Sequence, residues 1–253
     1  MLSLRELLSP FVAHPLAAEK LEQFHLYLDL LLKWNARINL TAVRDAEEIV
    51  QRHFGESIFA GEQLELEAAS TLIDFGSGAG FPGLPIAIIA PHLRVTLIES
   101  QQKKVAFLRE VIRSLRLENA TVHAGRAEET ALKSQIVTMR AVEKFESALP
   151  VAAALVEAAG CLALLIGLAQ AQFSCTALPQ FEWQKPIRIP DSRERVVMIG
   201  KLPPTMGLKT KSQDASPPAD PVLEMLGVGK DLWREIDSDD YVADLRGNGI
   251  PRA

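Results

Sequence analysis

The sequence predicts an α/β protein in which a mostly parallel, doubly wound sheet follows an N-terminal helical region. Two observations support this prediction. Apolar residues before position 70 recur at helical spacing, whereas after it short apolar runs alternate with helix-like stretches long enough for βαβ crossovers. We therefore divide the chain into a helical region at 1–69, an α/β domain at 70–201, and a linker with an acidic tail at 202–253.

The helical region contains two predicted helices. The first lies within 16–40, where one face carries Leu21, Phe24, Leu28, Leu31, Leu32 and Ile38. Trp34 on this helix is expected to pack in the core. Asp45 is placed to cap the second helix, with Glu48 in capping-box position. The apolar face of that helix is Ile49, Val50, Phe54 and Ile58.

Short apolar runs define the strands of the domain. Four parallel strands are predicted at 71–75, 95–98, 120–123 and 136–139, a fifth at 160–166, and a closing antiparallel pair at 183–189 and 195–199. The long apolar stretch at 149–171 is interrupted by Pro150, Glu157 and Gly160. It therefore indicates a buried helix followed by a buried strand, and not a membrane span.

Charge and cysteine usage narrow the class of protein. The net charge is −5, and residues 212–253 alone account for all of it, with nine acidic and four basic side chains. The first 211 residues are therefore neutral, which leaves room for a local basic face. Cys161 and Cys175 show no CxxC spacing, so we expect no disulfide and a cytoplasmic location. The five histidines show no metal-ligand spacing, so no metal is expected.

The most informative stretch is TLIDFGSGAGFPG at 71–83. Its strand ends at Phe75, and a helix is expected to begin near Pro82. Gly76, Gly78 and Gly80 lie between them, where a glycine backbone turns sharply and comes close to a ligand. The turn follows the first strand, at the sheet edge where open α/β sheets bind ligands.

Two ligands are compatible with such a turn. Gly78, Gly80 and Gly83 satisfy GxGxxG, the dinucleotide pattern. Three features favour S-adenosylmethionine: Asp74 before the first glycine, the tighter glycine spacing, and a proline where a dinucleotide fold needs free helix amides. Glu99 ends the second strand, where an acid binds both ribose hydroxyls.

Several motifs together resemble one known family. They are LKWNARINLT at 32–41, RH at 52–53, DFGSGAGFPG at 74–83, ESQQKKVAFL at 99–108, GRAEE at 125–129 and RA at 140–141. In order and spacing they are similar to the bacterial glucose-inhibited division protein B family, the guanine-N7 methyltransferase G of 16S ribosomal RNA. The resemblance covers about residues 20–200.

The resemblance implies a Rossmann-like class I methyltransferase fold, S-adenosylmethionine as cofactor, and the small ribosomal subunit as partner. It implies a cofactor site that includes Gly76, Phe81, Ala127, Glu128 and Arg140, beside Asp74, Gly78, Gly80 and Glu99. Lys103, Arg126 and Arg140 would supply positive charge to RNA from the carboxyl edge of the sheet. Arg140, which would touch both ligands, is the residue expected to act in catalysis.

The implied reaction needs no general base, because N7 of neutral guanine carries a free lone pair. Orientation of that lone pair toward the methyl group would supply most of the rate, about 7–11 kcal/mol in favourable models. Arginine would orient the base through O6. Two alternatives stay open: an NAD-dependent oxidoreductase, and a non-catalytic RNA-binding or assembly protein.

Two features depart from the family pattern. The fifth strand of the family usually ends Leu-Lys-Gly, whereas here Ile166 occupies the lysine position, which removes one expected positive contact. The tail places Trp233, Ile236 and Tyr241 among acids after a proline-rich linker. It looks similar to the toxin-binding ends of some antitoxins, which suggests a protein partner. The alternative is a helix that docks on the protein's own surface, or a chain end that stays partly disordered. The acidity of the tail argues against a place in the RNA site.

Overall fold

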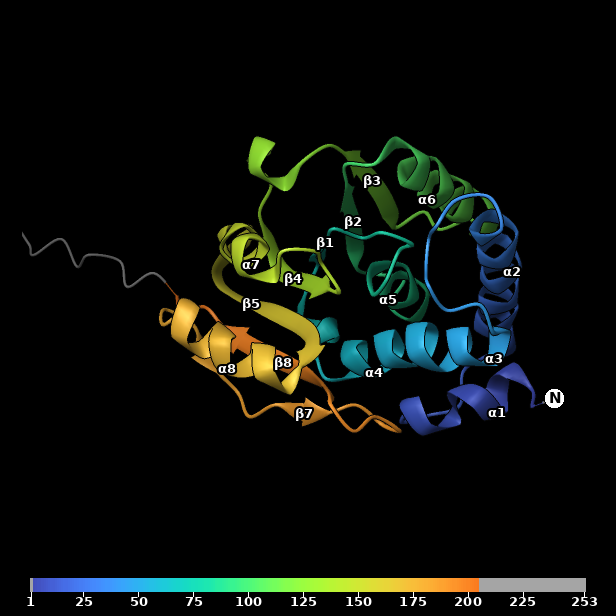
Figure 1. The fold of residues 1–253 in the computed structure, drawn as a ribbon, viewed down its shortest axis with the longest axis horizontal. Helices are drawn as coiled ribbons and strands as arrows, with labels where there is room; N and C mark the ends of the chain where they lie inside the picture. The colour runs from blue at the N-terminus through green and yellow to red at the C-terminus, as the bar shows by residue number, and fades with distance from the viewer. Residues whose placement is uncertain (1, 205–253) are drawn as a thin grey trace, which may run out of the picture. The chain divides into compact units, whose positions relative to one another are not determined.

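The computed structural model describes residues 2–204, so the predictions for the acidic tail lie outside the described residues. Residues before the sheet form α1 (Leu4–Leu8), α2 (Ala18–Asn35), α3 (Ala46–Ile49) and α4 (Glu56–Glu62). A π-helical segment, Val50–Gly55, joins α3 to α4 and makes one continuous helical stretch. The N-terminal region is therefore helical, as predicted (Figure 1).

The sheet is the predicted parallel, doubly wound one. Its strands are β1 (Thr71–Phe75), β2 (Arg94–Glu99), β3 (Ala120–Ala124), β4 (Ser134–Arg140), β5 (Val156–Gly167), β6 (Glu182–Trp183), β7 (Ile187–Arg188) and β8 (Arg195–Lys201). The order is β3-β2-β1-β4-β5-β8-β6, with β7 paired to β8. Strands β1 to β5 pair in parallel, and β8 runs antiparallel to β5.

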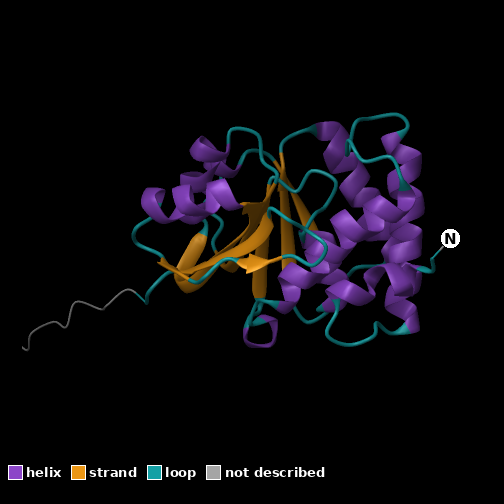
Figure 2. Ribbon diagram, turned by 60° about the horizontal axis from the view of Figure 1, so that its bottom comes forward, coloured by secondary structure: helices purple, strands orange, loops and turns teal. Residues whose placement is uncertain are grey.

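Helices cover both faces of this sheet, as the purple ribbons on either side of the orange strands show (Figure 2). They are α5 (Gly83–Ile89), α6 (Gln102–Leu115), α7 (Phe145–Ala154) and α8 (Leu168–Ala177). Alternate residues of β1 face opposite sides: Leu72 packs with the N-terminal helices, whereas Ile73 packs with the side chains of α7 and α8. Both faces of the central strands are therefore buried, which explains their continuous apolar runs.

One strand prediction was wrong. The stretch 183–189 forms parts of two short strands, β6 and β7, and not a single strand. Pro186 lies between them and has no N–H to donate to a neighbouring strand, so the ladder breaks there. Both short strands still pair antiparallel with β8, as predicted for the closing pair.

The helix ends also differ in detail from the sequence expectations. Asp45 caps α3 by accepting from the Glu48 amide at 2.8 Å. The Glu48 carboxylate instead pairs with Arg52 at 2.7 Å, because the two side chains are four residues apart on one helical face. Trp34 packs edge-on against Phe107 at 5.8 Å, which confirms its core position.

The apolar stretch at 149–171 divides between α7 and β5, as expected. Among the described residues, no helix is both long and apolar enough to cross a bilayer.

Candidate functional site

The site is built on the glycine turn between β1 and α5. Gly76, Gly78 and Gly80 all have positive φ, at 65°, 59° and 93°. A Cβ on Gly80 would lie 2.5 Å from both the Leu84 side chain and the Tyr27 hydroxyl, so only glycine fits there. A Cβ on Gly78 would meet only the Gly76 carbonyl oxygen, at 3.8 Å, which is an ordinary contact. The Gly78 amide donates to Glu99 Oε2 at 2.9 Å.

Asp74 supports this turn from below. Its side chain is fully buried and accepts from the Thr138 hydroxyl at 2.8 Å and from the Gly83 amide at 3.2 Å. Burial raises the pKa of Asp74 to about 6, although these hydrogen bonds oppose the shift. Asp74 therefore contributes to the site by holding the turn, and its carboxylate lies beneath the surface that a cofactor would touch.

Two pockets of about 500 Å³ each meet at Gly76, within the size range of small-molecule sites. The first, which we call the acidic pocket, lies over the ends of β1, β2 and β3. Its charged lining residues are Glu99, Glu128, Glu143, Arg126 and Lys144, a formal balance of −1. Glu99 is 6% exposed here, and its Oε1 accepts from the Gln101 amide at 2.8 Å.

The second, which we call the basic pocket, lies between the N-terminal helical stretch and the ends of β4, β5 and β8. Its charged lining residues among those described are Arg52, Lys104, Arg140, Arg195 and Glu56, a formal balance of +3. The two pockets thus differ in the sign of their net charge, although both are lined by Gly76.

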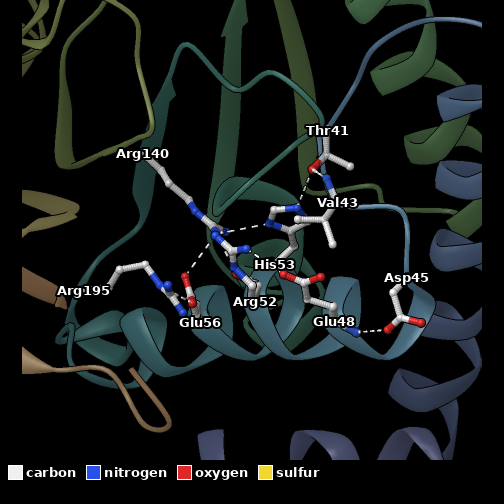
Figure 3. A network of polar contacts seen from close by, with 9 residues as sticks. All are labelled: Thr41, Val43, Asp45, Glu48, Arg52, His53, Glu56, Arg140 and Arg195. Atoms are coloured by element: carbon white, nitrogen blue, oxygen red, sulfur yellow. Dashed lines mark hydrogen bonds and ion pairs between the residues drawn. The ribbon is translucent and has the colours of Figure 1, made fainter. Parts of the chain in front are cut away.

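A buried carboxylate organises the basic pocket (Figure 3). Glu56, only 2% exposed, accepts from Arg140 Nη2 at 3.1 Å and from Arg195 Nε at 2.7 Å. The same Arg140 nitrogen also approaches the Arg52 carbonyl at 2.6 Å and His53 Nδ1 at 3.2 Å. Arg140 Nη1 is buried and has no hydrogen-bond partner among the described residues. That donor is available to a ligand, because an unpaired buried guanidinium N–H is costly.

His53 is held in one orientation beside this arginine. Its Nε2 hydrogen-bonds the Thr41 hydroxyl at 2.7 Å, and its ring stacks on Phe81 at 4.9 Å. Burial, reinforced by the charge of Arg140, lowers the pKa of His53 to about 3. The imidazole is therefore neutral at physiological pH, and the positive charge of the pocket comes from the arginines and Lys104.

The predicted site residues divide between the two pockets. Gly76 lines both. The basic pocket receives Gly78, Phe81 and Arg140, and the acidic pocket receives Glu99, Ala127, Glu128 and Arg126. Gly80 is buried within the turn. Lys103, at the start of α6, is exposed and lines neither pocket, whereas its neighbour Lys104 lines the basic one. The three cations expected to face RNA thus do not share a single pocket.

Sequence reasoning gave no role to Glu56 or Arg195. Glu56 is 84 residues from Arg140 and 139 residues from Arg195 along the chain. No local spacing links them, because the pairing depends on how the N-terminal helical stretch packs on the sheet. His53 belongs to the RH motif at 52–53, and that motif alone does not predict its contact with Arg140.

The strand order and the glycine turn after β1 define a Rossmann-like fold of the class I methyltransferase type. Two solved structures share it: the ribosomal protein L11 methylase from Lactobacillus delbrueckii (TM-score 0.51, 12% identity, covering 60% of this chain and 79% of that one), and P. horikoshii TYW2 in complex with MeSAdo (TM-score 0.50, 14% identity, covering 59% and 62%). At these identities the likeness concerns the fold.

The family model for rRNA small subunit methyltransferase G, GidB, matches residues 20–178, and the chain belongs to this family. Curated relatives named ribosomal RNA small subunit methyltransferase G include one from Lachnoclostridium phytofermentans, 44% identical over 134 residues, 51% of this chain and 55% of the relative. Another, from Bacillus subtilis, is 42% identical over 135 residues, 51% and 56%. The chain thus spans about half the length of the curated relatives it matches.

Proposed function

We propose that this protein transfers the methyl group of S-adenosylmethionine to N7 of a guanine in 16S ribosomal RNA of the small subunit. The observation that carries the proposal is the pair of pockets that meet at Gly76, one acidic and one basic. A cofactor with a ribose diol and a sulfonium suits the acidic pocket, and a polyanionic substrate suits the basic one. The names of the curated relatives agree with this assignment.

The acidic pocket fits the adenosyl part of the cofactor. Each Glu99 oxygen already accepts one backbone N–H, from Gly78 or Gln101, and each keeps a lone pair for a ribose hydroxyl. Gly76, Ala127 and Glu128 line this pocket with Glu99, and Gly78 and Phe81 of the basic pocket complete the proposed cofactor contacts. When bound, S-adenosylmethionine supplies an electrophilic methyl group.

The residues of the basic pocket would position the guanine. N7 attacks through its own lone pair, so no side chain has to remove a proton. The pKa of His53 is lowered to about 3, which makes its imidazole a weak base and agrees with this mechanism. The buried donor of Arg140 is suited to O6 of the base or to a phosphate. The rate would come mainly from orientation and from the exclusion of water.

Arg195 would compensate for the family lysine that Ile166 replaces. Ile166 and Arg195 both line the basic pocket, and Arg195 pairs across the sheet with Gly167, the residue after Ile166. The Arg195 Nε is bound to Glu56, and its Nη groups form no hydrogen bond within residues 2–204. We therefore assign Arg195 to the RNA contacts, beside Lys103, Arg126 and Arg140.

A dinucleotide fits this turn less well. The first amide of α5, on Gly83, donates to Asp74, so it is not free for a pyrophosphate. Calorimetry with S-adenosylhomocysteine and with NADH separates the two ligands, and only the first is expected to bind.

Radiolabelled methyl transfer to small subunits that lack the modification tests the activity. No transfer despite bound cofactor would favour a non-catalytic assembly role. Alanine at Lys103 or Arg126 should raise KM for RNA and weaken its salt dependence, and Arg140→Ala should also lower kcat. Unchanged RNA kinetics in all three variants would contradict the assignment of these residues.

The acidic tail enters the proposal as a separate element that binds a protein partner, in a protein of the cytoplasm. Its acidic side chains would repel RNA. Truncation after Leu202 should therefore leave cofactor affinity and methyl transfer nearly unchanged. A truncated chain that stays folded by circular dichroism but loses activity would place the tail within the enzyme.

A further inference from the structure

A third hollow lies beside the two pockets, between α7 and α8. Its lining is Lys144, Phe145, Glu146, Ser147, Ala169, Gln170 and Phe173. The Phe173 side chain is 37% exposed, which is unusual for a large aromatic residue. Phe145 is half-buried and meets Phe173 edge to face, with ring centroids 6.2 Å apart and planes at 63°.

This aromatic hollow is continuous with the proposed active site. It shares Gln170 with the basic pocket, and it shares Lys144 and Ser147 with the acidic pocket. Any strand of RNA whose guanine enters the basic pocket must continue across neighbouring surface. The hollow is one surface that adjoins both pockets.

The chemistry of the hollow suits a base and not a phosphate. Its one cation, Lys144, is balanced by Glu146 among the lining residues. What remains is aromatic surface together with Gln170 and Ser147. The Gln170 Oε1 accepts from the Gly167 amide, so its NH₂ group can donate to the edge of a base; the Ser147 hydroxyl donates to the Lys144 carbonyl and can still accept. The tilt between the two rings leaves no parallel slot, so a base would lie against the exposed face of Phe173 and not between the rings.

We propose that Phe145 and Phe173 form a stacking subsite for an unpaired base that neighbours the methylated guanine. The inference rests on the proposed function. Proteins that read RNA in a sequence-specific way mostly bind unstacked, single-stranded bases, and aromatic side chains are the usual platform for them. Phe145 supports Phe173 from the core side, because it packs against the cluster beneath α7.

Substitutions at Phe173 test this subsite in the full chain with unmethylated small subunits. Phe173→Leu keeps an apolar side chain but removes the π face, and we expect KM for RNA to rise about tenfold, with the affinity for S-adenosylhomocysteine unchanged. Phe173→Trp should keep the wild-type KM. Leu168→Ala is the matched control, because Leu168 is 47% exposed on the same helix and does not line the hollow.

Two direct readouts do not depend on turnover. Filter binding of unmethylated 16S RNA should weaken with Phe173→Leu by the same factor as KM. The added fluorescence of Phe173→Trp should be quenched by that RNA, since stacking brings a base onto the indole.

A Phe173→Leu variant with wild-type RNA affinity would overturn the proposal. A wild-type chain that binds RNA but transfers no methyl would refute the proposed function. In that case the binding and quenching measurements would still decide whether the subsite exists.

Discussion

Replacement of Glu56 by glutamine should destabilise the fold strongly, because it breaks a buried ion pair. The carboxylate serves two guanidinium groups, Arg140 at 3.1 Å and Arg195 at 2.7 Å. Glutamine offers one oxygen acceptor and one NH₂ group, so at least one arginine would face a donor. Arg140, with 11% of its side chain exposed, would remain charged and without its counterion.

The expected cost follows from the burial of each pair. Breaking a buried pair by removing one partner costs about 3–5 kcal/mol. The contact with Arg195 adds little, because 38% of that side chain is exposed and water screens it. For a domain of this size the loss corresponds to a fall in Tm of about 6–20 °C.

Thermal unfolding followed by circular dichroism measures this loss. Glu48→Gln is the matched control: it removes the Arg52 pair, in which both side chains are more than 40% exposed, and should cost less than about 1 kcal/mol. Added anionic RNA should recover part of the Glu56→Gln loss, because phosphate would neutralise the uncompensated arginine. Equal Tm values for the two variants would refute the argument that Glu56 is a buried counterion.

Three further predictions concern the turn, the basic pocket and the histidine. Gly78→Asp should abolish detectable S-adenosylhomocysteine binding in calorimetry while circular dichroism stays native, because it places a carboxylate beside Glu99; affinity within threefold of wild type would reject the cofactor pocket. Arg195→Ala should raise KM for RNA and reduce the slope of its salt dependence by about one. Adding Ile166→Lys to this variant should restore the wild-type KM and the wild-type salt slope. An unaltered salt slope in Arg195→Ala would exclude Arg195 from the RNA contacts. The pKa of His53 is lowered to about 3 in the folded chain. Below about pH 6.5 this histidine therefore takes up a proton in the unfolded chain but not in the folded one, so the folded state loses stability as pH falls from about 6.5 toward 3. Urea titrations at about pH 6 and pH 4 should show a loss of stability from this residue of up to about 1.4 kcal/mol per pH unit. The loss should be absent from a His53→Gln variant, and parallel pH profiles of the two proteins would contradict the prediction.

The architecture was predictable from the sequence because its signals are local. Strands β1 to β5 were recognisable as short apolar runs, since both faces of a parallel sheet are buried. The glycine turn was also predictable from the sequence. Gly80 has no room for a Cβ, so this position requires glycine, and the residue type itself indicates the turn. The prediction of a single strand at 183–189 was wrong because Pro186 interrupts the pairing. The proline is visible in the sequence, but the pattern of apolar residues alone did not predict the break.

The division of the site depended on the tertiary structure. Sequence reasoning placed Lys103, Arg126 and Arg140 on one sheet edge, because the carboxyl ends of parallel strands share an edge. That reasoning does not say which pocket a side chain lines, and the structure separates Arg126 from Arg140 and puts Lys104 where Lys103 was expected.

By itself, the sequence determined the fold class, the glycine turn and the resemblance on which the cofactor assignment rests, since each depends on residues close together in the chain. Only the tertiary structure decided that Glu56 lies between Arg140 and Arg195, that His53 stays neutral, and that Asp74 supports the turn from beneath. The physical reason is that burial and charge pairing act between residues tens of positions apart. Their strength is set by how the N-terminal helical stretch packs against the ends of β4 and β8, and no local pattern encodes that packing.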